Sequence, residues 1–181
     1  MLDQDALNSL TQMLWMTPRD RVFAALDGAS VPGLLDQLYA DPRPEFECLH
    51  RGELEPDMAE VAPYLVALER GSAFAEWVMT QGWGNHWGIF IAAPTDLRGL
   101  RFHLRPLNIA YDPQGMPNMF RYYDPRVLRT FLPTCDAGQI AEMFGPIERF
   151  VAEDNLPQNA LSFTQAGGEL QTGTRQISRT K

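Results

Sequence analysis

The segment from His103 to Pro133 carries the clearest local folding signals in this chain. Two short runs rich in strand-favouring residues, 104–110 and 118–123, flank the sequence Asp-Pro-Gln-Gly at 112–115. Proline at the second position and glycine at the fourth favour a type I turn, so this segment predicts a hairpin. Asp124, followed by proline, has the sequence of a helix N-cap. We therefore expect the hairpin to lead directly into a helix that ends before Pro133.

Short strand and helix patterns also alternate along the rest of the chain. The run from Trp87 to Ala93 contains few polar residues, which is typical of a central strand. Alternation of strands and helices up to Ala93 favours parallel pairings, and the hairpin adds an antiparallel one. The sequence therefore predicts an α/β fold with a mixed central sheet flanked by helices. Its sheet is expected to include strands near Arg21, Trp87, Leu104 and Asn118.

The length and composition of the chain fit one main domain with a short appendage. With 181 residues, of which 45% are hydrophobic, the chain can bury a sizeable core. We assign residues 1–154 to an α/β domain. Beyond Glu153 the composition shifts to glutamine, glycine, threonine and serine, so residues 155–181 are predicted to be a polar C-terminal extension. Gly167 and Gly168 suit the turn of a short β-hairpin there, and a flexible tail is the alternative.

The charge pattern limits the partners that this chain can bind. Its formal net charge is -8, and most of the excess acid lies before residue 77. Phosphate repulsion argues against nucleic acid as a partner. No stretch approaches the ~18 apolar residues of a membrane span, and the first residues lack a basic region followed by an apolar run. We therefore expect a cytoplasmic protein that binds neither nucleic acid nor a membrane.

Cysteine and glycine motifs give little support for an enzyme. Cys48 and Cys135 lie far apart, without metal-ligand spacing, which favours two free thiols in a reducing compartment. The glycine-rich stretch from Gly82 to Gly88 precedes a strand and lacks the spacing of a phosphate-binding loop, so we interpret it as a turn.

The histidines complete the search for catalytic or metal-binding groups. His50, His86 and His103 are each isolated in the sequence, and none belongs to a zinc-binding pattern. A nucleophile, base and orienting acid could be drawn from Cys135, His103 and Asp124, but Cys135 lacks the local signatures of a thiol enzyme. We predict no catalytic residues, no metal and no cofactor. A cysteine-dependent or metal-dependent hydrolase remains the enzymatic alternative.

Arginine and tyrosine side chains gather around the predicted hairpin. If the run from Phe120 to Arg126 begins as a strand, alternation places Arg121 and Tyr123 on one face. One interpretation is that this side of the protein binds a partner, through the residues Arg105, Arg121, Tyr123 and Arg126. The other is that the arginines form internal ion pairs with two acids, Asp27 and Asp124, to which we assign structural roles. A regulatory module that binds a small anion through the arginines is a further alternative.

Six short pieces of the sequence occur in the order seen in a known family. The most specific is Phe-Arg-Tyr-Tyr-Asp-Pro-Arg-Val-Leu at 120–128. The others are Ala25–Gly28, Ala62–Val66, the glycine stretch with Trp83 and Trp87, His103–Arg105 and Phe144–Ile147. From about Val22 to Val151 the chain resembles the type VI secretion adaptor family, whose domain is catalogued as of unknown function and occurs in effector chaperones.

The resemblance implies a cytoplasmic, non-enzymatic adaptor. Such a protein would bind a toxin effector and help to load it onto the valine-glycine repeat spike protein, VgrG. It implies no catalytic residues. We expect partners to contact exposed apolar side chains ringed by charge, on the hairpin side of the protein. The acidic segment from Glu53 to Glu60 is the competing surface, because it could steer a basic partner.

Overall fold

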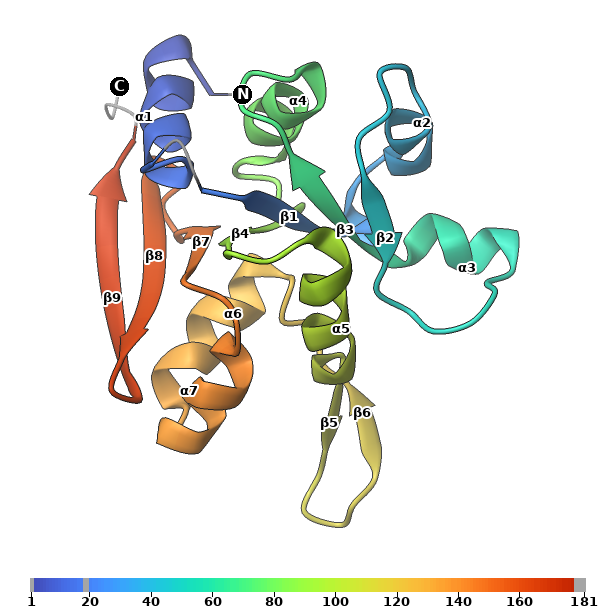
Figure 1. The fold of residues 1–181 in the computed structure, drawn as a ribbon, viewed down its shortest axis with the longest axis vertical. Helices are drawn as coiled ribbons and strands as arrows, with labels where there is room; N and C mark the ends of the chain where they lie inside the picture. The colour runs from blue at the N-terminus through green and yellow to red at the C-terminus, as the bar shows by residue number, and fades with distance from the viewer. Residues whose placement is uncertain (1, 18–19, 178–181) are drawn as a thin grey trace.

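The computed structural model describes residues 2–17 and 20–177. In that part of the chain, seven strands form one sheet in the order β2-β3-β1-β4-β7-β8-β9, and every pairing is antiparallel (Figure 1). The strands are β1 (Val22–Asp27), β2 (Phe46–Cys48), β3 (Pro63–Leu68), β4 (Gly88–Ala92), β7 (Arg149–Glu153), β8 (Asn159–Ala166) and β9 (Glu169–Gln176). The predicted α/β class is confirmed, and β4 is central as expected.

The expected parallel pairings are wrong, for a reason that lies in the connections. β3 and β4 point the same way, because each pairs antiparallel with β1, and the helix α4 (Ala73–Gly82) crosses from one to the other. β1 lies between these two strands and pairs with the edge of each that faces the other, so β3 and β4 do not pair with one another. The helix after β1 is α2 (Leu34–Leu38), and its five residues rise only about 7.5 Å. That is too short to carry the chain back along a strand into a parallel neighbour.

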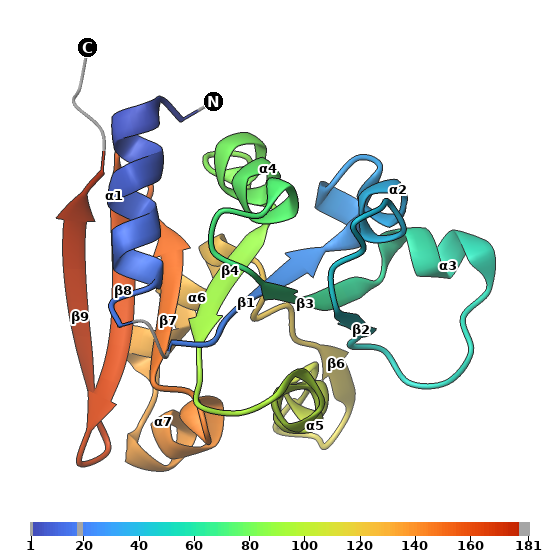
Figure 2. The same cartoon turned by 45° about the horizontal axis from the view of Figure 1, so that its top comes forward.

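One face of the sheet is covered by three helices from the first half of the chain (Figure 2). They are α1 (Gln4–Leu14), α2 and α4. Alternate strand residues such as Val22, Ala24 and Leu26 point into this layer, as the two-residue period of a strand requires. Leu10 and Met79 meet them from α1 and α4.

The opposite face is covered by three helices from the second half of the chain. These are α5 (Leu97–Leu107), α6 (Pro125–Phe131) and α7 (Ala137–Phe144). The other set of strand residues, including Ala25, Ile89 and Phe150, packs against them. The sheet is therefore the middle of three layers, and both of its faces are buried.

The predicted hairpin at residues 104–123 exists, but it is shorter and lies outside the main sheet. β5 (Ile109–Tyr111) pairs with β6 (Pro117–Met119) as a separate two-stranded ribbon, which projects from the body of the protein (Figure 1). Leu104 belongs to α5 instead of a strand, and Asn118 pairs within the ribbon. Both were wrongly placed in the central sheet. We call the ribbon and its turn, residues 109–119, the arm.

The C-terminal extension continues the main sheet. β8 pairs with β7, and β9 pairs with β8 from Asn159 to Gln176, which confirms the predicted hairpin. Gly167 and Gly168 have φ angles of 61° and 83°, as a tight turn with two left-handed residues requires. Residues 178–181 lie outside the part that the structure describes.

The remaining helical elements are short, and one of them lies in the acidic segment from Glu53 to Glu60. From Pro56 onward the acidic segment belongs to the short helix α3 (Pro56–Val61). The short 3-10 turns η1 (Gly28–Ser30) and η2 (Leu132–Thr134) complete the helical elements. Within residues 2–17 and 20–177, no helix is long and apolar enough to cross a membrane.

Candidate functional site

Arg121 and Asp27 form an ion pair that joins the segment after the arm to the end of β1. Asp27 is 2% exposed, and it also accepts hydrogen bonds from the Ala29 amide at 3.2 Å and the Ser30 hydroxyl at 3.0 Å. A buried carboxylate needs such partners, so Asp27 has the structural position that we predicted. The Arg121 side chain is still 43% exposed.

Arg126 and Asp124 form a second ion pair at the start of α6. The Asp124 carboxylate caps the helix by accepting from the Arg126 amide at 2.9 Å, and it binds the Arg126 guanidinium at 2.7 Å. Asp124 is buried, which favours its neutral form, but these hydrogen bonds and the positive charge of Arg126 hold the pKa of Asp124 below its usual value. The internal ion pairs considered for Arg121 and Arg126 are therefore confirmed.

Tyr123 is 3% exposed and lies in the core beneath these pairs, so it does not form part of a binding surface. It was expected to share a strand face with Arg121, but residues 121–124 form a turn closed by a hydrogen bond from the Asp124 amide to the Arg121 carbonyl. Burial raises the pKa of the Tyr123 phenol to about 12. Of the four predicted partner-binding residues, Arg121 and Arg126 remain half exposed, and Arg105 lies in the pocket described below.

The residues considered for catalysis do not come together. Cys135 donates to the Phe131 carbonyl at 3.5 Å, His103 contacts the Met143 carbonyl at 3.1 Å, and Asp124 binds Arg126. Both cysteines are free thiols, as predicted. Across residues 2–17 and 20–177, no group of three or more histidine, cysteine, aspartate or glutamate side chains is placed to hold a metal ion.

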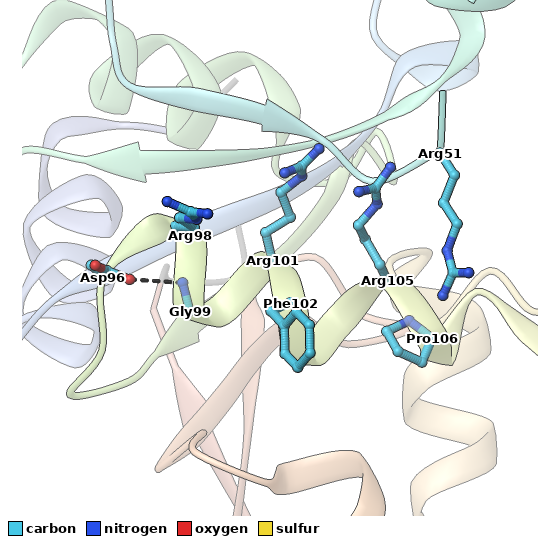
Figure 3. A pocket seen from close by; sticks show the side chains of 8 residues that line it. All are labelled: Arg51, Asp96, Arg98, Gly99, Arg101, Phe102, Arg105 and Pro106. Atoms are coloured by element: carbon cyan, nitrogen blue, oxygen red, sulfur yellow. Dashed lines mark hydrogen bonds between the residues drawn. The ribbon is translucent and has the colours of Figure 1, made fainter. Parts of the chain in front are cut away.

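The exposed side of α5 forms a pocket of about 650 Å³. Arg98, Arg101 and Arg105 follow at spacings of three and four residues, so they share one face of the helix, while Leu100, Leu104 and Leu107 are buried on the other. Figure 3 shows the three arginines along the helix with Arg51 opposite them. We call this hollow the arginine pocket, and its lining residues are Arg51, Asp96, Arg98, Gly99, Arg101, Phe102, Arg105 and Pro106.

Contacts from α5 to backbone carbonyl groups hold Arg51 opposite the helix. Arg101 donates to the Cys48 carbonyl at 3.2 Å, Arg105 donates to the His50 carbonyl, and Asn108 donates to the Leu49 carbonyl at 2.9 Å. These bonds fix the chain that follows β2 against the helix. Burial lowers the pKa of the Arg105 guanidinium, and the positive charges of Arg101 and Arg51 lower it further. The pocket is therefore a site of concentrated positive charge.

The arm that follows α5 presents an exposed apolar face. In its register Ile109 lies opposite Met119, and Tyr111 lies opposite Pro117. Cross-strand partners and alternate residues share a face, so these four side chains lie together, and all of them are exposed. Tyr111 is 70% exposed, and Phe102 on α5 is 84% exposed. Exposed apolar side chains gathered on one face are typical of a protein interaction site.

One family matches most of this chain. The pattern of the family described as a domain of unknown function, DUF4123, matches residues 22–142. The chain belongs to the DUF4123 family. The matched region runs from β1 into α7 and includes the arginine pocket and the arm. No curated protein and no solved structure matches the chain.

The sequence pieces that suggested a family meet in this DUF4123 fold. The Gly28 amide donates to the Ala62 carbonyl at 3.1 Å, Arg121 binds Asp27, and Gly145 lies against the His103 ring, with no space for a side chain. Each contact joins two pieces that are far apart in the sequence. These pieces therefore build the scaffold of the DUF4123 domain, while the pocket and the arm are largely made by other residues.

Sequence reasoning missed several residues of this surface. Arg51, Arg98 and Phe102 were not proposed, nor was the apolar face of the arm. The spacing of Arg98, Arg101 and Arg105 indicates a shared arginine face once residues 97–107 are recognised as one helix. Arg51 carried no such signal, because it reaches the pocket only through tertiary contacts.

Proposed function

We propose that this DUF4123 protein is a cytoplasmic adaptor that binds a type VI secretion effector and helps to load it onto the VgrG spike protein. The observation that carries the proposal is the arm. Its four exposed apolar side chains share one face of an isolated two-stranded ribbon. Such a ribbon is only marginally stable in water, and a partner that covered the apolar face would stabilise it.

The sequence resemblance supports the same function. The ordered pieces from Ala25 to Ile147 resemble those of type VI adaptors, and the family match over residues 22–142 includes all of them except Phe144–Ile147. The arm and Phe102 provide apolar contacts, and the neighbouring arginines provide charged ones. Protein interfaces commonly combine an apolar centre with a polar and charged rim. The proposal involves no catalytic step, metal or cofactor.

Co-expression with candidate effector and spike proteins tests the proposal. The tagged chain is produced together with the spike protein and the toxin candidates encoded beside its gene, and complexes are isolated by pull-down. We expect the chain to retain an effector, the spike or both. If the well-folded chain retains none of these proteins, the adaptor function is wrong.

A matched pair of variants tests whether the arm is the binding surface. Tyr111→Asp with Met119→Asp places two charges on the apolar face of the arm, and should abolish retention of at least one partner. Met16→Asp with Leu156→Asp changes two exposed apolar residues elsewhere and should leave retention unchanged. Circular dichroism confirms folding of both variants. If both variants retain the partners equally well, the arm is not the binding surface, and the acidic segment from Glu53 to Glu60 becomes the candidate.

The arginine pocket favours a second candidate function, a regulatory module that binds a small anion. Four arginines line the pocket, and a guanidinium group binds phosphate or carboxylate in a bidentate manner. A small anion that binds only the folded state raises the melting temperature, and the stabilisation grows with the logarithm of its excess over the dissociation constant. Stabilisation by phosphate or nucleotides that Arg98→Gln abolishes would support this function.

A further inference from the structure

The charges of the arginine pocket are not balanced within the described part of the chain. Two carboxylates, Glu47 and Asp96, lie at the pocket, and both are already engaged. Glu47 binds Arg101 at 3.3 Å, and Asp96 caps α5 by accepting from the Gly99 amide at 2.7 Å. The pocket therefore keeps excess positive charge in a chain whose formal net charge is -8.

Two of the guanidinium groups are available to a ligand. Arg51 and Arg98 are exposed and form no hydrogen bond or ion pair with the described residues. Arg105 uses one amino group on the His50 carbonyl, and its buried Nε has no partner within residues 2–17 and 20–177. The geometry of an arginine fork matches a carboxylate, which can accept two parallel hydrogen bonds. The pocket thus offers several unused donors to an anionic ligand.

Phe102 indicates that the ligand is larger than a simple anion. Its ring lies in the lining of the pocket and is 84% exposed, next to Arg98 and Arg105 along the same helix. A phosphate ion would leave this ring in water. A peptide segment with an apolar side chain beside its carboxylates would cover the ring and also pair with the arginines. Aromatic residues and arginine are frequent anchors of protein interfaces.

The surroundings of the pocket disfavour nucleic acid. Glu53 and Glu55 follow Arg51 closely, and Asp57 and Glu60 continue the acidic segment into α3. A long polyanion that left the pocket in this direction would be repelled, whereas a compact acidic segment would place its charge only at the arginines.

We infer that the arginine pocket binds an acidic peptide segment of the effector or the spike, with its carboxylates on Arg51 and Arg98 and an apolar side chain on Phe102. This inference rests on the proposed adaptor function and specifies the chemistry of the partner. The arm, which continues from α5, supplies further apolar contacts to the same partner.

Fluorescence anisotropy with defined peptides tests the pocket without the natural partner. The first probe is a labelled peptide in which pairs of glutamates flank a leucine, and the second has glutamine in place of each glutamate. We expect only the acidic peptide to bind. Arg51→Gln with Arg98→Gln should weaken binding by at least about tenfold, because two charge-assisted contacts are lost. Phe102→Ala should also weaken it. Arg70→Gln with Arg175→Gln removes the same charge from exposed sites elsewhere and should leave binding nearly unchanged.

Three results would overturn the inference. The first is equal affinity for the two peptides, or for wild type and the Arg51 and Arg98 variant. The second is preferential binding of a single-stranded DNA oligonucleotide, or full displacement of the peptide by inorganic phosphate at low concentration. The third is concentration-dependent self-association in sedimentation experiments that the Arg51 and Arg98 variant abolishes, since a second copy would then occupy the pocket.

Photocrosslinking identifies the segment in the assembled complex. A photoreactive phenylalanine analogue replaces Phe102 during co-expression with effector and spike, and mass spectrometry locates the crosslinked peptide. We expect a segment rich in aspartate and glutamate. A neutral or basic segment would contradict the inference while leaving the adaptor function intact. If neither partner forms a complex, the adaptor function fails, and the peptide measurements still decide whether the pocket binds acidic segments.

Discussion

Replacing Asp124 with alanine removes a helix cap and one member of a buried ion pair in a single step. The lost cap, a hydrogen bond of 2.9 Å from the Arg126 amide, costs about 1 kcal/mol. Loss of the ion pair with the Arg126 guanidinium costs less stability than loss of a fully buried pair would. Arg126 is 50% exposed, and water can hydrate it once Asp124 is gone, so we assign about 1 kcal/mol to this contact. The expected total loss of stability is about 2 kcal/mol.

Asp136→Ala is the control, because Asp136 is also the N-cap of a helix, α7, but has no ion pair with an arginine among the described residues. It accepts from the Gln139 amide at 2.8 Å and is exposed, so its removal should cost about 1 kcal/mol. The difference between the two variants measures the contribution of Arg126. Asp124→Asn keeps a capping side chain and removes the charge, so its stability should lie between that of wild type and that of Asp124→Ala.

Urea denaturation followed by tryptophan fluorescence measures these differences. In a chain of this length, 1 kcal/mol corresponds to a melting-temperature change of about 2–4 °C, so Asp124→Ala should melt about 4–8 °C below wild type. A loss equal to that of Asp136→Ala would show that the pair with Arg126 adds no stability. A loss below about 0.5 kcal/mol would refute the structural role of Asp124.

Three other properties can be predicted from the structure. The folded state lowers the pKa of Asp124. The charged carboxylate therefore stabilises the protein above the unfolded pKa of about 3.9, and this contribution is lost at lower pH. Between pH 5 and 3, the free energy of unfolding should fall more for wild type than for Asp124→Asn. Gly88→Ala would bring a side chain within 2.2 Å of the Ala25 carbonyl in the centre of the sheet. Chemical denaturation should show that this variant is severely destabilised. Gly138→Ala in α7 is the control, and it should be nearly neutral or stabilising. Burial raises the pKa of the Cys48 and Cys135 thiols, so both should react with a thiol probe more slowly at pH 7 in the folded protein than in urea; rapid reaction of folded Cys135 would favour the hydrolase alternative.

The positions of most elements could be predicted from the sequence because their signals are local. Asp124 precedes a helix and caps it as expected, and Asp96 and Asp136 cap α5 and α7 from the same position before the helix. Residues 104–110 were predicted to form the first strand of the hairpin, although residues 104–107 belong to α5. In the structure the helix continues to Leu107, and burial of Leu104 and Leu107 favours this longer helix. This difference shortened the predicted hairpin and hid the arginine face.

The strand order and the pocket could not be predicted locally. No signal within β1 shows that it lies between β3 and β4, because that position depends on pairings with strands about 40 and 65 residues away. In the same way, Arg51 lines the same pocket as Arg98 only because α5 binds the carbonyl groups of Cys48 and His50. Sequence patterns identify residues that share one element. They do not identify a site formed between elements that are distant along the chain.

The most specific stretch of sequence, residues 120–128, fixes the base of the arm. The Phe120 amide donates to the Asn108 carbonyl at 2.8 Å, the Tyr122 hydroxyl donates to the Leu104 carbonyl at 3.2 Å, and Arg121 binds Asp27. These contacts join both ends of the arm to α5 and to the central sheet. Substitutions in the scaffold and substitutions in the binding surface should therefore have different effects. Changes at Arg121 or Asp27 should reduce stability and binding together, whereas changes at Phe102 or Tyr111 should reduce binding alone, because these exposed rings add little to the core.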